Sequence, residues 1–136
     1  MIKINGQWFS MDDIDEINKH LKSGIINVLG LYDETESICF LCKDGYTVQM
    51  YHCQDCCEYV RLYEDDCLIN GIDIFTDCDW CEMQETIQEG KSDEYGSSTW
   101  TYYNFKTNKG YDNMRWLGES NGYYSESVDF NIYKTK

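Results

Sequence analysis

Three runs of alternating residues near the end of the chain most constrain its fold. They span 98–105, 111–117 and 123–133, and glycine-containing turns separate them. A side-chain period of two is typical of half-buried β-strands, and short turns between such runs predict hairpins. We therefore expect these three runs to form an antiparallel meander.

The alternation also assigns side chains to faces of the expected sheet. On the core face we expect Met114, Trp116, Trp100, Tyr102, Tyr124, Val128, Phe130 and Ile132. On the opposite face we expect an exposed polar and aromatic patch, formed by Asn113, Arg115, Tyr123, Ser125 and Ser127.

The first half of the chain predicts a helix followed by short strands. Asn5-Gly6 predicts a tiny hairpin, Ser10 can cap the helix, and the apolar stripe within 11–22 is helical in period. Further strands are expected at 25–30, 37–42, 46–51, 58–63 and 72–75, a helical turn at 65–69, and a loop at 86–97.

These elements predict an α+β fold. We expect one twisted antiparallel sheet with the N-terminal hairpin and helix packed on it. The length suits a single domain over 1–136, in which 1–24 is a hairpin-helix appendage and 25–136 is the β-rich body.

The charge is strongly acidic, with a net charge of −14. Most of this negative charge lies in residues 55–94, because the many acidic residues of this segment are balanced only by Arg61 and Lys91. Direct nucleic-acid binding is excluded, because it requires Lys and Arg to neutralise phosphates. The segment is either a solvated face or a surface that docks on a basic partner. For the second case the contact residues would be Asp65, Asp66, Asp73, Asp77, Asp79, Glu82 and Glu85.

Eight cysteines raise the question of disulfides or a metal. The chain starts without a signal-peptide pattern and has no apolar run long enough to span a bilayer, so we expect a cytosolic protein with reduced thiols and no membrane partner. Cys53-x-x-Cys56 and Cys78-x-x-Cys81 resemble the two ligand pairs of a structural zinc site. The alternative is that the cysteines are small buried apolar residues.

No catalytic pattern is evident. A cysteine nucleophile needs a neighbouring base, and His52 and Cys53 would point to opposite faces of a strand. Phosphate-binding glycine loops and serine elbows are absent from the sequence. We therefore expect a protein that is not an enzyme.

Two motifs carry a resemblance to a known family. Residues 51–58 read Tyr-His-x-Gln-Asp-Cys-Cys-Glu, and residues 118–126 read Gly-Glu-Ser-Asn-Gly-Tyr-Tyr-Ser-Glu. Together they resemble an uncharacterised family of small proteins common in phages and prophages. The resemblance implies a phage or mobile-element origin and residence in a bacterial host cytosol, but no activity. Cys53 and the pair Cys78 and Cys81 depart from the family pattern.

The leading hypothesis is a phage accessory protein that binds and inhibits a host protein. A basic nucleic-acid-binding defence enzyme, as targeted by anti-CRISPR or anti-restriction proteins, would suit the acidic segment through nucleic-acid mimicry. One alternative is a protein that binds and sequesters a small molecule such as a nucleotide signal, and another is a zinc-stabilised interaction module. Candidate ligand-binding residues for the first alternative are His52, Asp55, Arg115, Asn121 and Tyr123.

Overall fold

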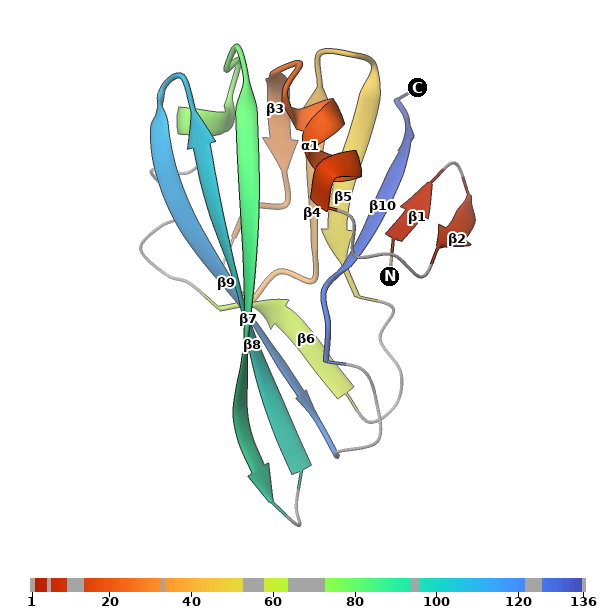
Figure 1. The fold of residues 1–136 in the computed structure, drawn as a ribbon, viewed down its shortest axis with the longest axis vertical. Helices are drawn as coiled ribbons and strands as arrows, with labels where there is room; N and C mark the ends of the chain where they lie inside the picture. The colour runs from red at the N-terminus through yellow and green to blue at the C-terminus, as the bar shows by residue number, and fades with distance from the viewer. Residues whose placement is uncertain are drawn as a thin grey trace.

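The computed structural model describes residues 2–4, 6–9, 14–32, 34–52, 58–63, 73–93, 96–121 and 126–135. The described strands form two sheets, and helix α1 (Ile14–Leu21) lies beside them (Figure 1). The protein is mostly β with a small helical part. The predicted single sheet is wrong, because strands that follow one another along the chain divide between two layers.

The larger sheet has six strands in the order β2-β1-β10-β5-β4-β3. Its strands are β1 (Ile2–Ile4), β2 (Gln7–Phe9), β3 (Ile25–Leu29), β4 (Ser37–Cys42), β5 (Tyr46–Tyr51) and β10 (Asp129–Lys134). Neighbours are antiparallel except β1 and β10, which run parallel with Ile2 opposite Phe130. The N-terminal hairpin therefore extends this sheet instead of packing on its face.

The smaller sheet has four strands in the order β6-β9-β8-β7. They are β6 (Glu58–Leu62), β7 (Cys81–Asp93), β8 (Gly96–Thr107) and β9 (Gly110–Ser120). The predicted hairpin between β8 and β9 is confirmed. The third strand of the predicted meander is wrong, because β10 pairs with β5 and β1 in the other sheet.

The loop predicted at 86–97 is also wrong. Residues 86–93 and 96–97 belong to the long strands β7 and β8, which project beyond the rest of the smaller sheet in Figure 1. Residues 86–90 are exposed whichever face they lie on, and apart from Ile87 none of them has a large apolar side chain. The alternation that reveals a half-buried strand is absent where neither face is covered.

The hydrophobic core lies between the two sheets. The rings of Phe40 on β4 and Phe105 on β8 are 5.4 Å apart, and Phe75 packs edge-on to both. Phe75 belongs to a helical turn at 73–75, so the strand predicted at 72–75 is wrong. A short apolar run does not by itself distinguish a strand from a helical segment.

The predicted core face is confirmed for β9 and β10 and wrong for β8. Met114, Trp116 and the apolar side chains of 128–132 are buried. Trp100 and Tyr102, however, are only partly buried, whereas Thr101, Tyr103 and Phe105 are buried. Both phases of β8 carry aromatic residues, so the sequence pattern did not distinguish its inner face from its outer one.

Helix α1 packs against the edge strand β7. Ile17 and Leu21 are buried, and Asn18 reaches the backbone of Met83. The side-chain Nδ2 of Asn18 donates to Met83 O at 2.9 Å, and Met83 N donates to Asn18 Oδ1 at 2.7 Å. Gly24 closes the helix with φ +95°, a left-handed conformation that glycine adopts without steric cost.

Candidate functional site

The outer face of the smaller sheet carries a cluster of arginines and aromatic rings. We call Tyr59, Arg61, Tyr63, Trp100 and Arg115 the aromatic–arginine face. Arg115 Cζ lies 5.3 Å from the centre of the Trp100 ring and 5.6 Å from that of Tyr63. Arg61 Cζ lies 4.5 Å from the centre of Tyr59. These distances are within the range of cation–π attraction.

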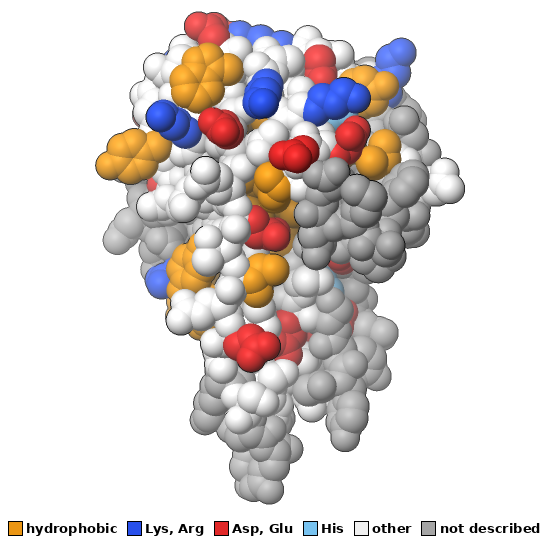
Figure 2. Space-filling model, in the orientation of Figure 1, with side chains coloured by type: hydrophobic (Ala, Val, Ile, Leu, Met, Phe, Trp, Pro, Cys, Tyr) orange, Lys and Arg blue, Asp and Glu red, His pale blue; other side chains and the backbone are white. Residues whose placement is uncertain are grey.

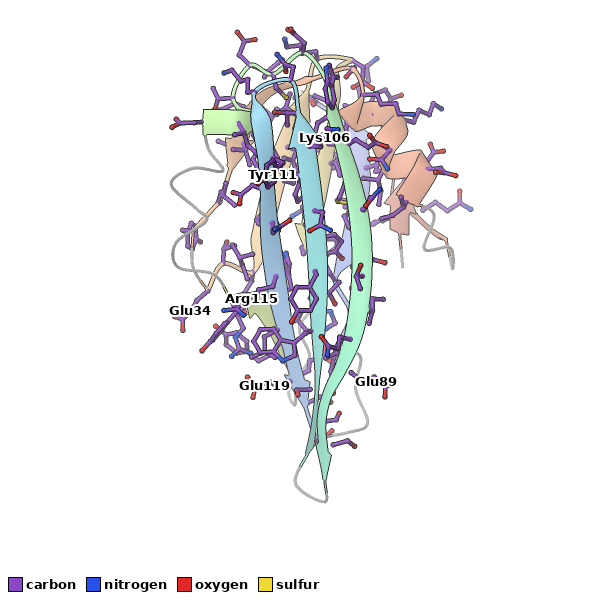
Figure 3. All side chains as sticks on the ribbon, turned by 60° about the vertical axis from the view of Figure 1, so that its left-hand side comes forward. Glu34, Glu89, Lys106, Tyr111, Arg115 and Glu119 are labelled. Atoms are coloured by element: carbon purple, nitrogen blue, oxygen red, sulfur yellow. The ribbon has the colours of Figure 1, made fainter. Side chains whose placement is uncertain are left out.

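The alternation of side chains along and just after β6 explains three of the five residues of this cluster. Val60 and Leu62 point into the core, so Tyr59, Arg61 and Tyr63 fall on the outer side. The other two come from β8 and β9, where Arg115 is in register with Tyr102, two residues along each strand from the pair of Trp100 and Leu117. Figure 3 shows Arg115 partway along β9, with Glu119 nearer the strand's end.

Hydrogen bonds hold both guanidinium groups in place. Arg115 Nε donates to Tyr63 O at 3.0 Å. Arg61 Nη2 lies 2.7 Å from Glu119 Oε1. The Tyr63 and Trp100 rings meet edge to face at 5.5 Å. The face is therefore preorganised, although the two tyrosines of β6 remain more than two-fifths exposed.

A buried cluster of titratable groups lies where the chain crosses between the sheets. His52 Nε2 is 2.6 Å from Glu58 Oε1, and its Nδ1 is 2.6 Å from Ser127 O. Asp129 Oδ2 lies 3.5 Å from the same Nδ1. A backbone carbonyl only accepts hydrogen bonds, so Nδ1 carries a hydrogen. The side chains of His52 and Glu58 are 2% and 4% exposed, which leaves a substrate no access.

Glu126 forms a second polar cluster beside β8 and β9. Its carboxylate accepts hydrogen bonds from Ser120 Oγ at 2.5 Å, Thr99 Oγ1 at 2.8 Å and Ser97 Oγ. Burial alone raises the pKa of Glu126, but the three hydroxyl donors outweigh it and lower the pKa below its ordinary value.

A family model describes most of this chain. The match is to a domain of unknown function, DUF7448, and covers residues 9–130. The chain belongs to the DUF7448 family. No curated protein and no solved structure matches it. Within the described residues, the DUF7448 chain has no helix with the length and apolar character that crossing a bilayer requires.

The buried His52 cluster of the DUF7448 chain connects the first sequence motif with residues just after the second. His52 and Glu58 come from the first motif, while Glu126 ends the second, and Ser127 and Asp129 follow it. The Glu126 cluster instead joins the end of the second motif to β8 and β9. Cys53, Asp55, Cys56 and Tyr123 lie outside the described residues.

The cysteines that are described are free thiols. Cys42, Cys78 and Cys81 are fully or almost fully buried, and Cys78 contributes to raising the pKa of both Cys42 and Cys81. Burial, with smaller contributions from Asp44 and Cys78, raises the pKa of Cys42 to about 12. Burial likewise raises the pKa of Cys78 and Cys81. In the described part of the chain, no group of three or more His, Cys, Asp or Glu is placed to hold a metal ion.

The acidic residues singled out by sequence differ in their contacts and in whether the structure describes them. Asp73, Asp77, Asp79 and Glu82 are exposed, and Asp65 and Asp66 are outside the described residues. Lys43 Nζ lies 3.2 Å from Asp77 and 3.8 Å from Asp79. Glu85 instead accepts a hydrogen bond from the buried Tyr103, at 2.8 Å. The face in Figure 2 accordingly mixes acidic and basic side chains at its upper end.

The three ligand residues predicted from sequence that the structure describes lie in different surroundings. His52 is buried between the sheets, Arg115 lies on the outer face, and Asn121 is exposed after β9. Sequence reasoning missed Tyr59, Arg61 and Tyr63. Their signal was readable, because an aromatic or arginine alternates with an apolar residue across 59–63.

Proposed function

We propose that the protein is a non-enzymatic accessory protein that binds another protein through the aromatic–arginine face. The observation that carries this proposal is the stacking of Arg61 and Arg115 among three aromatic rings on the outer side of a sheet. Tryptophan, tyrosine and arginine are the residues enriched at the energetic centres of protein interfaces.

The preorganisation of the face supports the same proposal. Side chains already fixed by the contacts of Arg61 with Glu119 and of Arg115 with Tyr63 lose less conformational entropy on binding. The non-enzymatic part of the proposal is supported by the two histidines. His20 and His52 are 7% and 6% exposed, and each is held by a carboxylate, from Asp44 and Glu58 respectively.

The finer part of the proposal is that the partner is a host defence protein, which the chain inhibits from the cytosol of a bacterial host. The resemblance of its motifs to phage proteins motivates the choice of host. The net charge of −14 would speed encounter with a basic, nucleic-acid-binding target. Of the acidic residues expected from sequence to contact such a target, Asp73, Asp77, Asp79 and Glu82 are exposed in the described part of the chain.

A photo-crosslinking experiment tests the binding face. A photoreactive amino acid replaces Tyr102, beside Arg115 on the outer face, or Tyr32, which is 61% exposed and follows β3 of the larger sheet. We expect a discrete adduct in host cells from position 102 only, and its loss in the variant that also carries Arg115→Ala. Equal adducts from both positions, or an adduct that survives Arg115→Ala, would contradict the proposal.

Charge reversal tests the finer part. We expect Asp73→Lys with Asp77→Lys and Asp79→Lys to slow association with the captured partner and to weaken the salt dependence of the rate. An unchanged salt dependence would show that the acidic residues do not mimic nucleic acid, while leaving the aromatic–arginine face as the contact.

A further inference from the structure

A polar cavity opens on the same sheet, at the end away from Glu119. Its volume is about 390 Å³, and side chains from β7, β8 and β9 line it. That volume lies within the usual range for small-ligand sites, roughly 300–1,000 Å³. Figure 3 shows two of its residues, Lys106 and Tyr111, near the turn that joins β8 and β9.

The strand register arranges the lining in two rows. In one row, Glu82, Lys106 and Tyr111 lie opposite one another across three strands. In the next row, the carboxamides of Gln84, Asn104 and Asn113 do the same. Neighbouring strands are about 4.8 Å apart, so each row places three polar groups within reach of one small molecule.

The three carboxamides are not used by the fold. Within the described residues, no hydrogen bond involves the side chain of Gln84, Asn104 or Asn113. The contrast is Asn18, whose amide is fully engaged with Met83. Each free carboxamide presents a donor and an acceptor side by side in one plane.

The charges that line the cavity favour a neutral ligand over an anion such as phosphate. Glu82 lies opposite Lys106, so the lining carries one negative and one positive group. Lys109, the next cation along the chain, already donates to Thr76 O at 2.6 Å. A phosphate group would therefore meet a single cation, Lys106, with the negative charge of Glu82 on the neighbouring strand. Binding of a phosphate group usually uses several donors or cations.

We infer that this cavity binds a purine nucleoside without its phosphates. Paired donor and acceptor groups of Asn and Gln match the N6 and N7 edge of adenine. The ring of Tyr111, which is 79% exposed, offers a surface on which a base can stack. The carboxylate of Glu82 can accept from ribose hydroxyls, as acidic residues do at other nucleoside sites.

Adenosine is the probe that tests this inference. In a titration followed by amide NMR, we expect saturable shifts of the side-chain NH₂ signals of Gln84, Asn104 and Asn113. Adenosine monophosphate should bind no more tightly than adenosine. Asn104→Ala should weaken adenosine binding about tenfold, whereas Gln88→Ala, on the same outer side of β7 but outside the lining, should leave it unchanged.

Three results would overturn the inference. The first is the absence of shifts in those NH₂ signals at millimolar adenosine. The second is tighter binding of the monophosphate than of adenosine, which would indicate an anion site. The third is equal binding of a disaccharide such as maltose, which would indicate a carbohydrate site. Binding of the protein partner to the aromatic–arginine face is measured separately, so neither proposal depends on the other.

Discussion

The imidazole of His52 and the carboxylate of Glu58 join the two sheets across 2.6 Å. His52 follows β5 of the larger sheet, and Glu58 begins β6 of the smaller one. Both side chains are almost fully buried, so water would not readily replace this contact if one partner were removed. We therefore expect this contact to stabilise the packing of the two sheets at the point where the chain passes from one to the other.

Removing that contact should destabilise the fold. We expect Glu58→Gln to lower the free energy of unfolding by about 2–4 kcal/mol, because a buried charge-assisted hydrogen bond is lost. The matched control is Glu119→Gln, which breaks the partly exposed pair with Arg61 and should cost at most about 1 kcal/mol. Urea unfolding measures both variants, and equal losses would contradict the role given to Glu58.

Glu126 should make the stability depend on pH. Its pKa is lower in the folded chain than its ordinary value of 4.5, so the folded state binds fewer protons than the unfolded state near that pH. The stabilisation is fully present above about pH 4.5 and is lost as the pH falls through the lowered pKa.

Replacing one of the three donors tests this origin of the shift. Thr99→Val should raise the pKa of Glu126 and cost about 0.5–1.5 kcal/mol at neutral pH, with a smaller cost at pH 3. Thr86→Val changes an exposed residue of β7 in the same way and should do neither. Carbon-detected NMR of the Glu126 carboxyl follows the pKa, and an unchanged value in Thr99→Val would contradict the assignment.

Local sequence patterns predicted where strands occur better than they predicted which strands pair with one another. The runs at 37–42, 46–51 and 58–63 and the hairpin of β8 and β9 could be read from alternation and turn residues. The place of β10 could not, since it pairs with β5, far away in sequence. Alternation says which side of a strand is apolar, but not which strand lies next to it.

The candidate site could be predicted only in part, for the same reason. Arg115 was placed on an outer face from its own strand, and the alternation of Tyr59, Arg61 and Tyr63 was visible in the sequence. Their meeting with Trp100 depends on the order β6-β9-β8, which only the structure gives. The sequence also did not show on which face of β8 Trp100 lies, because aromatic residues occupy both faces of this strand.

A side chain at Gly118 in β9 should destabilise the fold. A Cβ at this position would contact the backbone carbonyl of Glu126 and lie 2.9 Å from its carbonyl carbon. We expect Gly118→Ala to cost about 1–3 kcal/mol, because the backbone near Glu126 must shift. In the control Gly90→Ala, the closest contact is the hydroxyl of Ser98, which can rotate, so the cost should be smaller. Thermal unfolding compares the two, and a larger loss in Gly90→Ala would contradict this account.

The buried thiols should resist alkylation. Cys42, with a pKa of about 12, is almost entirely protonated at both pH 7 and pH 9, so at either pH it should react with iodoacetamide far more slowly than an exposed cysteine with an ordinary pKa. Cys78 and Cys81 should behave alike, because burial raises the pKa of both.

Mass spectrometry of peptides from alkylated protein measures each rate. The half-buried Cys39 serves as the internal control and should react first, while all cysteines should react in denaturant. A zinc ion on Cys78 and Cys81 would protect them for a different reason, since metal-bound thiolates are already deprotonated. The two causes separate when a chelator is added. Unchanged rates support protonated buried thiols, whereas faster alkylation together with loss of one zinc from the native mass would contradict them and establish a metal site.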